Sequence, residues 1–308
     1  MLINESLIVL INYNSTQFTQ DCIDSIRKIE NSDYSIFIFD NNSSAAEVEK
    51  LSLFLNLPDF RKDTLVTAAH FSIRIFSYFS STNSGFAIGN NRALNLVSNV
   101  GFDFKYYLFL NNDTLLTQPI LEKFISQDAS EVNKAFLTCK IMTPDQMIWY
   151  NGGSISRIEC IGKHSYSVSE FPKIEDVGFM TGCCLFFNHE LLSKFGNKIF
   201  DESYFMYTED VDFSATAHLK NIKLKILRDI SIIHRVYGSS KQSMNSSLPF
   251  YYMNRNRFLF AKKFLKKSEI PFFFIFMILR SFYLIIVKRN SMLLAGSIDG
   301  LKLFFNKD

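Results

Sequence analysis

The chain has 308 residues, with 33 Lys and Arg against 30 Asp and Glu and a formal net charge of +3. An apolar fraction of 47% and a charged fraction of 20% exclude a disordered chain, and so small a net charge gives no ground for a nucleic-acid partner. The 5 cysteines form no Cys-x-x-Cys pair and no zinc-type Cys/His spacing, so we expect reduced thiols in a cytosolic protein. The first apolar run follows Glu5 without a basic leader, which predicts a strand and not a signal peptide.

The N-terminal part of the chain alternates between strand-like and helix-like segments. Continuous apolar runs that end in polar residues are typical of buried parallel strands, and apolar residues at helical spacing predict helices between them. This alternation predicts an open, mostly parallel sheet with helices on both faces. The predicted strands cover residues 6–14, 34–44, 70–80 and 105–114, and the predicted helices cover residues 15–30, 45–57 and 83–99.

Polar side chains follow three of these strands at the point where each strand ends. They are Asn12 and Asn14, then Asp40 and Asn41, then residues 111–113. Each set alone suits an ordinary turn, because Asn and Asp favour turns. Ligands of open α/β sheets bind beyond the carboxyl ends of the strands. Three such ends in succession therefore predict a nucleotide-sized site.

The middle of the chain, residues 116–177, is less regular than the first part. Within it, residues 149–166 suggest a loop or a hairpin insertion over the site. Residues 177–196 predict a strand that passes directly into a helix.

Three carboxylates, Glu209, Asp210 and Asp212, stand within four residues of one another. Such charges repel one another and are costly to bury without a partner. Asp113 after the fourth strand and His234 after a later apolar run suit a divalent ion such as Mg²⁺ or Mn²⁺. An ion that also bound a diphosphate would explain why carboxylates collect in this chain.

An apolar run over residues 270–287 carries a single charge, Arg280, near its middle. The run falls short of the about 20 apolar residues that span a bilayer, and a central arginine costs roughly 2.5–3.5 kcal/mol on insertion. Its basic flanks suit a helix that lies on anionic lipid. We expect a helical, membrane-contacting region over residues 248–308, and a buried core helix is the alternative for residues 270–287. The flanking residues are Lys262, Lys263, Lys266, Lys267, Lys288 and Arg289.

Several common catalytic motifs are missing from the sequence. No G-x-G-x-x-G follows the first strand, and no G-x-x-x-x-G-K-[ST], G-x-S-x-G or H-E-x-x-H occurs. Their absence argues against a dinucleotide Rossmann domain, a P-loop nucleotidase, an α/β-hydrolase and a zinc metalloprotease of these types.

Six short segments follow one another along the chain: IVLINYNS, FDNNSS, NSGFAIGNNRAL, FLNNDT, FMTGCCLFF and FMYTEDVDFSATA. In this order they resemble the bacterial family 2 glycosyltransferases of the GT-A fold. The closest likeness is to the rhamnosyltransferase-type subgroup that builds O-antigen and other surface polysaccharides, which HRVYGSS and YYMNRNRFLFAKKF also resemble. The resemblance implies a GT-A α/β domain over residues 1–247, followed by the helical, membrane-associated region.

The resemblance implies a nucleotide-sugar site at the strand ends. Asp40 would accept the imide N–H of uracil or thymine, and the glycines of the loop after the third strand would let the backbone approach the nucleotide. The residues implied in donor binding are Asn12, Tyr13, Asn14, Asp40, Asn83, Gly85, Phe86, Gly89, Asn90 and Asn112.

The resemblance also implies a metal site and a catalytic pair. Residues 111–113 stand where the fold carries an Asp-x-Asp motif, and because Asn111 replaces the first Asp, Asp113 would be the main carboxylate ligand of Mg²⁺ or Mn²⁺. His234 resembles a late-strand histidine that reaches the metal or the diphosphate, with a core or turn histidine as the alternative.

Asp210 would be the catalytic base, taking a proton from an acceptor hydroxyl that attacks the anomeric carbon and inverts it. Glu209 would orient that hydroxyl, and the two roles can be exchanged. A charge pair favoured by the helix macrodipole is the structural alternative. Gly182 and Asp212 would lie on the acceptor side, and a metal-site role or a helix cap are alternatives for Asp212.

The implied activity is an inverting hexosyl transfer, with L-rhamnose moved from dTDP-rhamnose onto a lipid-linked glycan. The enzyme would be peripheral at the cytoplasmic face of the bacterial inner membrane. A UDP-hexose donor is the alternative within the class. A degenerate, non-catalytic GT-A scaffold stays open because of Asn111, although Asp113 and the acid pair argue against it. A nucleotidyltransferase would need a Gly-rich basic loop after the first strand, which NYNSTQFTQ does not supply.

Overall fold

The computed structural model describes residues 2–57, 60–70, 73–130, 135–166, 172–235, 248–283 and 291–306. The strands are β1 (Leu2–Asn12), β2 (Tyr34–Asp40), β3 (Leu65–His70), β4 (Ile73–Phe79), β5 (Asp103–Leu110), β6 (Thr114–Leu116), β7 (Ala135–Met142), β8 (Ile148–Tyr150), β9 (Gly153–Ser156), β10 (Ile161–His164), β11 (Ile174–Asp176), β12 (Cys184–Asn188) and β13 (Lys223–His234). The helices are α1 (Thr16–Ile29), α2 (Ala45–Phe54), α3 (Gly85–Asn99), α4 (Leu121–Ser130), α5 (His189–Lys194), α6 (Glu209–Leu219), α8 (Leu248–Phe264), α9 (Ile270–Tyr283) and α10 (Ser291–Phe305).

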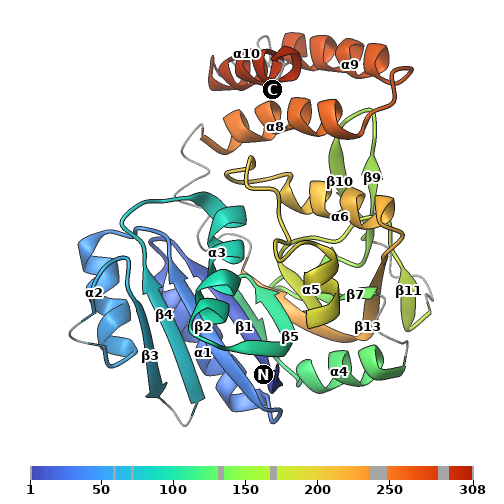
Figure 1. The fold of residues 1–308 in the computed structure, drawn as a ribbon. Coiled ribbons are helices and arrows are strands. Elements are labelled where there is room, and N and C mark those ends of the chain that lie inside the picture. Colours follow the sequence, from blue (N-terminus) through green and yellow to red (C-terminus); the bar gives the residue numbers. More distant parts are fainter. Residues whose placement is uncertain are drawn as a thin grey trace.

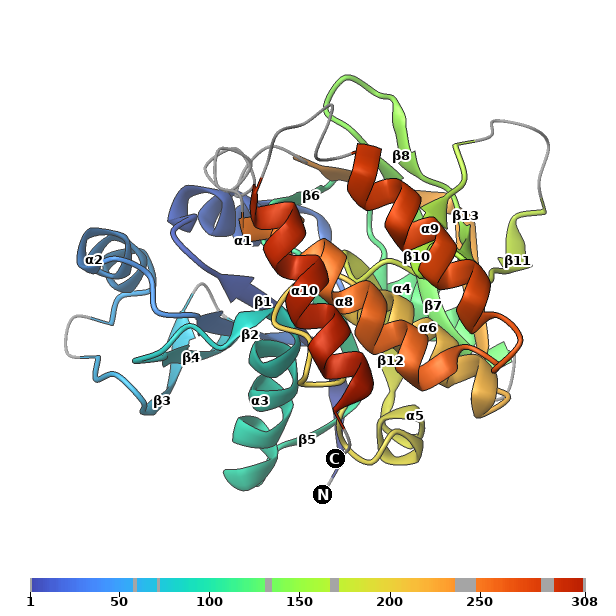
Figure 2. The same ribbon diagram turned by 90° about the horizontal axis from the view of Figure 1, so that it is seen from above.

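The centre of the main sheet is parallel, as the alternation of strands and helices predicts. The sheet is 11-stranded, with the order β11-β13-β7-β12-β5-β1-β2-β4-β3 and with β6 and β8 paired beside it. β1 runs parallel to β2 and β5, and β2 runs parallel to β4. Seen from above, α1 and α2 lie on one face of this parallel part and α3 lies on the other (Figure 2). The four predicted strands and three predicted helices of this part are confirmed.

The edge strand β3 was not predicted from the sequence. It pairs antiparallel with β4, and its side chains are only partly buried. Sequence patterns detect β1 more easily, because its residues from Leu7 to Leu10 are fully buried and leave an unbroken apolar run. A half-exposed edge strand leaves no such run.

The second half of the sheet is mixed. β12 runs antiparallel to β5 and leads directly into α5, as predicted for residues 177–196. The predicted hairpin at residues 149–166 is present as β9 and β10. The buried strand β7 was missed, because Thr138 and Lys140 break its apolar run, although Thr138 is buried and donates to the carbonyl of Cys184 at 2.7 Å.

The C-terminal helices α8, α9 and α10 stack together beside α6 and the β9–β10 hairpin (Figure 1). The backbones of α10 and α8 are in direct contact at two glycines of α10. A Cβ placed on Gly296 would lie 2.3 Å from the carbonyl oxygen of Tyr251. One placed on Gly300 would lie 2.8 Å from the carbonyl oxygen of Arg255. Among the described residues, no helix combines the length and the apolar character needed to cross a membrane. The predicted boundary at residue 247, Lys288 and Arg289 lie outside the described residues.

Candidate active site

A cavity of about 480 Å³ opens where the central parallel strands end. Its lining comes from the ends of β1, β2 and β5, the loop before α3 with the start of that helix, the segment before α6 and the start of α8. The polar lining residues lie on the strand ends and the loop, and apolar residues from the later segments face them. The lining consists of Ile11, Tyr13, Asn14, Ser15, Asn41, Asn83, Gly85, Phe86, Asn111, Asn112, Asp113, Phe205, Met206, Tyr207, Leu248 and Pro249.

A buried amide network ties the three strand ends together beneath this lining. Asn12 donates from Nδ2 to Asp40 Oδ2 at 2.7 Å, and its Oδ1 accepts from Thr19 Oγ1 at 2.8 Å. Asn112 donates to Ser15 Oγ and Thr19 Oγ1, both at 2.8 Å. Because buried polar groups are costly without partners, this network fixes the strand ends relative to one another.

Three of the predicted donor-binding residues stand behind the lining. Asn12 belongs to the buried network, and Asp40 is 1% exposed and also accepts from Ser43, at 3.0 Å from its amide and 2.6 Å from its hydroxyl. Asn90 is buried in α3 and donates to the carbonyl of Phe86 at 3.0 Å. The remaining predicted donor residues line the cavity, except Gly89, which packs against Ile11 and Phe39. Contact between Asp40 and a base stays a prediction.

The far wall of the cavity comes from residues that the sequence did not place there. Gly85 has φ +84°, and a Cβ on it would lie 2.1 Å from the carbonyl oxygen of Phe205. The amide of Phe86 donates to the same carbonyl at 2.9 Å. Glycine is therefore required at this position, and the close contact brings the Phe205–Tyr207 segment over the strand ends. The aromatic run FMYT was visible in the sequence, but nothing local indicated which surface it would face.

Asp113 and His234 form the predicted polar pair at one end of the cavity. His234 Nε2 lies 3.0 Å from Asp113 Oδ1, and both side chains are less than one-tenth exposed. β13 brings them together by pairing with β6, which places His234 opposite Thr114. His234 Nδ1 is buried without a hydrogen-bond partner, and the ring of Trp149 lies 4.6 Å from the imidazole, centroid to centroid. In the described part of the chain, no group of three or more His, Cys, Asp or Glu side chains could hold a metal.

The acid pair Glu209 and Asp210 begins α6 and lies beside the cavity, outside its lining. The amide of Gly182 donates to Asp210 Oδ2 at 3.4 Å. A Cβ on Gly182 would lie 3.2 Å from the Phe86 ring and 3.7 Å from Asp210 Cβ. Gly182 therefore sits between the lining residue Phe86 and Asp210 of the acid pair, and its role on the acceptor side stays a prediction.

Burial changes the protonation of the pair. Burial, to which the charge of Asp210 adds, raises the pKa of Glu209 to about 8, and Glu209 Oε2 has no hydrogen-bond partner. Burial raises the pKa of Asp210 to about 6, against the opposing hydrogen bond from Gly182. Near neutral pH the pair therefore shares one proton and carries one negative charge. We assign the charge to Asp210, because it accepts a hydrogen bond from Gly182 whereas Glu209 Oε2 accepts none.

Glu209→Gln should stabilise the protein at alkaline pH. A carboxyl whose pKa is raised on folding contributes stability that is fully present below its unfolded pKa, near 4.5, and is lost as the pH rises to about 8. Glutamine keeps the neutral form at every pH. We expect thermal unfolding to show a Tm higher by several degrees at pH 8 and little change at pH 5.

Glu47→Gln is the matched control for that measurement. Although partial burial opposes it, hydrogen bonds from Thr16 and Lys50 lower the pKa of Glu47. Its contribution is present above its unfolded pKa, so the glutamine variant should lose stability at pH 8. A Glu209→Gln protein whose Tm at pH 8 is unchanged or lower would contradict the assigned protonation.

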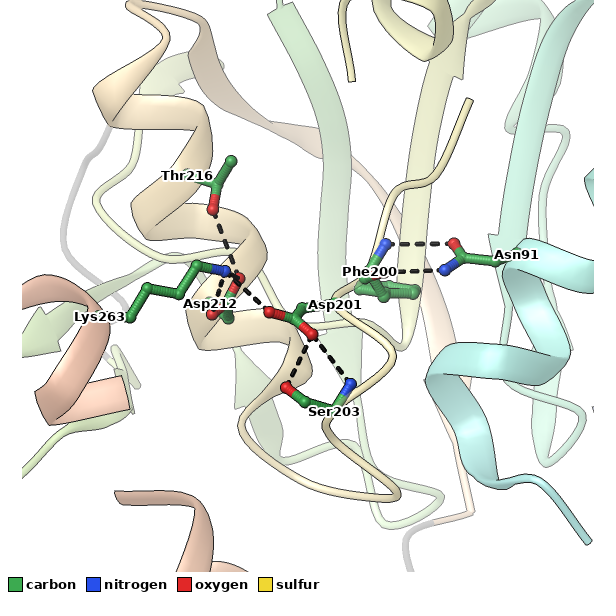
Figure 3. A network of polar contacts seen from close by, with 7 residues as sticks. All are labelled: Asn91, Phe200, Asp201, Ser203, Asp212, Thr216 and Lys263. Atoms are coloured by element: carbon green, nitrogen blue, oxygen red, sulfur yellow. Dashed lines mark hydrogen bonds and ion pairs between the residues drawn. The ribbon is translucent and has the colours of Figure 1, made fainter. Parts of the chain in front are cut away.

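Asp212 has a different partner from the one expected. Both of its carboxylate oxygens accept hydrogen bonds from Lys263 Nζ of α8 at 2.8 Å, and the same ammonium lies 3.0 Å from Asp201 (Figure 3). Asp212 is 2% exposed and lies within the first turn of α6. These contacts account for its burial without a metal or an acceptor, so its acceptor role stays a prediction.

Comparison with known proteins agrees with the predicted family. Residues 7–196 match the family described as Glycosyl transferase family 2. The rhamnosyltransferase WbbL of Escherichia coli (strain K12) is 25% identical over 219 residues, which cover 62% of this chain and 76% of that protein.

Two solved structures share the fold. S. aureus TarS has a TM-score of 0.53 at 15% identity, covering 83% of this chain and 39% of its own. The mannosyltransferase PcManGT from Pyrobaculum calidifontis, in complex with GDP-Man and Mn²⁺, has a TM-score of 0.54 at 11% identity, covering 98% of this chain and 77% of its own. This chain thus spans well under half of TarS, and identities this low establish the common fold alone.

Proposed function

Because the chain belongs to glycosyltransferase family 2, we propose that it moves L-rhamnose from dTDP-rhamnose onto a hydroxyl of a lipid-linked glycan, with inversion. The observation that carries this proposal is the placement of Asp113 in the lining of a nucleotide-sized cavity, with the acid pair beside that cavity. The likeness to a protein named as a rhamnosyltransferase supports the sugar. A UDP-hexose is the second candidate donor.

In the proposed mechanism the two acids have separate roles. Asp210, ionised near neutral pH, removes the proton from the acceptor hydroxyl as its oxygen attacks the anomeric carbon. Glu209, protonated over the same range, can donate a hydrogen bond to the acceptor and thereby orient it. The lining residues hold the nucleotide, and the diphosphate leaves on the side opposite to the attack.

We also propose that Asp113 and His234 hold a divalent ion, Mg²⁺ or Mn²⁺. The residues fit such a group, because a carboxylate in the cavity lining lies 3.0 Å from Nε2 of a buried imidazole. Two ligands of one ion lie about 3 Å apart, close to the observed separation. Mg²⁺ commonly takes one or two protein ligands and completes its shell with phosphate and water. When bound, the ion would offset the charge of the departing diphosphate.

The C-terminal helices suit a membrane surface, which is where a lipid-linked acceptor would be found. α9 exposes a row of large apolar side chains, with Phe272, Leu279 and Phe282 each more than 60% exposed. Lys266 and Lys267, exposed at its start, add positive charge that attracts anionic lipid. Arg280, which would oppose burial in lipid, is half-buried and donates to Asn254 of α8 at 3.2 Å. These features support our proposal that the protein works at the cytoplasmic face of the inner membrane.

Replacing Phe272, Leu279 and Phe282 together by Ser should reduce flotation with vesicles of phosphatidylglycerol and phosphatidylethanolamine. Burying one large apolar side chain is worth about 1.5–3 kcal/mol, so the binding constant should fall at least about tenfold even with partial insertion. The matched control replaces Leu53 and Leu219, exposed by 66% and 73% on α2 and α6, and should float like the wild type. Equal flotation of all three proteins would overturn membrane contact through α9.

The test of the proposed activity is transfer from a panel of dTDP- and UDP-sugars, with Mg²⁺ or Mn²⁺, measured as nucleoside diphosphate release. Turnover of one donor names the sugar. Binding of a nucleotide without turnover would indicate that the acceptor is missing from the assay. Neither binding nor turnover across the panel would favour a degenerate scaffold.

A further inference from the structure

The segment that leads into the acid pair, residues 199–208, contains no helix or strand and is held by side chains of two helices. At its start, Asn91 of α3 accepts from the amides of Ile199 and Phe200 at 3.0 and 3.2 Å and donates to the carbonyl of Phe200 (Figure 3). At its end, Asn256 of α8 donates to the carbonyls of both Met206 and Tyr207.

Asn256 is fully buried and both N–H groups of its amide are used. Nδ2 donates to the carbonyl oxygens of Met206 at 2.9 Å and of Tyr207 at 2.7 Å, and Oδ1 accepts from Arg255 at 2.8 Å. An amide offers two donors on one nitrogen. The side chain therefore fixes two successive peptide groups directly before the acid pair.

The backbone at this point needs such support. Tyr207 and Thr208 have φ of 63° and 74°, the left-handed region that side chains with a Cβ rarely adopt. Each such residue costs on the order of 1–2 kcal/mol and persists only where its surroundings hold it. Released from Asn256, the two residues would relax, and Glu209 and Asp210 would turn with them.

We propose that Asn256 is a positioning residue that sets the orientation of Glu209 and Asp210 toward the acceptor by holding the Met206 and Tyr207 carbonyls. The inference rests on the proposed role of the acid pair in transfer. α8 therefore supplies part of the catalytic geometry although it lies outside the matched family segment, which ends at residue 196. A change of about 1 Å in a reacting group can lower the rate about 100-fold, so a residue without contact to the substrate can have a large effect.

The kinetic test compares Asn256→Ala with Asn254→Ala in the full chain. Asn254 lies on the same helix and is equally buried, but it accepts from Arg280 on the side of α9. We expect Asn256→Ala to lower kcat about 10- to 100-fold with a donor KM within about threefold. Asn254→Ala should keep kcat within about twofold. Equal losses in the two variants, or a loss confined to KM, would reduce Asn256 to a structural residue.

Hydrogen–deuterium exchange tests the inference without any turnover. Amides of residues 205–210 should exchange faster in Asn256→Ala than in the wild type, and Asn254→Ala should leave them unchanged. Unchanged exchange in Asn256→Ala would overturn the positioning role. If exchange rises but the wild type transfers no sugar from any donor, the proposed function fails while the hold of Asn256 on this segment stands.

Discussion

Asp210→Asn should slow sugar transfer by orders of magnitude while leaving donor binding intact. Asparagine keeps the shape of the side chain but cannot accept the acceptor proton, and a positioned general base contributes about 10²- to 10⁴-fold. We therefore expect a fall of that size in kcat, with a nucleoside diphosphate Kd close to the wild-type value, because Asp210 lies outside the cavity lining. Calorimetric titration with the nucleotide separates the two quantities.

The pH dependence of the wild type adds a second requirement. Because burial raises the pKa of Asp210 to about 6, kcat should fall as the pH drops below that value and the base becomes protonated.

The control for Asp210→Asn is Asp201→Asn, which removes a nearby carboxylate that pairs with Lys263. This variant should transfer sugar at a rate within about threefold of the wild type. An Asp210→Asn enzyme with wild-type kcat would refute its role as base.

Asp113→Asn should remove metal binding, and the single tryptophan provides a signal for it. Trp149 lies against His234, so Mn²⁺ bound by His234 and Asp113 would quench its fluorescence. We expect saturable quenching in the wild type that is lost in Asp113→Asn, together with a fall in transfer of roughly 100-fold or more. The fluorescence signal needs neither donor nor acceptor.

His164→Gln is the control for the metal measurement. His164 packs on Trp149 with a centroid separation of 4.6 Å, the same as that of His234. Its loss changes the surroundings of the tryptophan without removing either proposed ligand, so Mn²⁺ should still quench. Identical quenching curves for the wild type and Asp113→Asn would place the ion elsewhere.

The sequence predicted those parts of the site that are visible within one continuous segment of the chain. The polar ends of β1, β2 and β5 come together because each follows a long buried run, and parallel strands place their carboxyl ends at one edge. The GT-A resemblance then implied roles for Asp113, as a metal ligand, and for the acid pair, in catalysis. What the sequence could not show was which of these side chains face the cavity: Asn14 lines it, whereas Asn12 and Asp40 are buried behind the lining.

The remaining features depend on packing between distant segments. The contact of His234 with Asp113 follows from the pairing of β13 with β6, and the ion pair of Asp212 with Lys263 follows from the packing of α8 on α6. No pattern within a single segment encodes either contact. In the sequence, the one hint of the cavity wall at Phe205 was Gly85, because a glycine allows another backbone to approach closely. The sequence does not show that the Phe205 carbonyl is the group that approaches it.

The backbone contact between α10 and α8 limits how this protein can be shortened or recombined. Gly296 and Gly300 of α10 leave no room for a side chain against α8. Because α8 in turn carries Asn256, which holds the segment before the acid pair, a shift of α10 would be passed on to Glu209 and Asp210. A chain cut before Leu248 would lose part of the cavity lining along with its apolar surface. Exchanging this tail between relatives should therefore alter turnover, because the exchanged α8 would also carry Asn256 and part of the cavity lining.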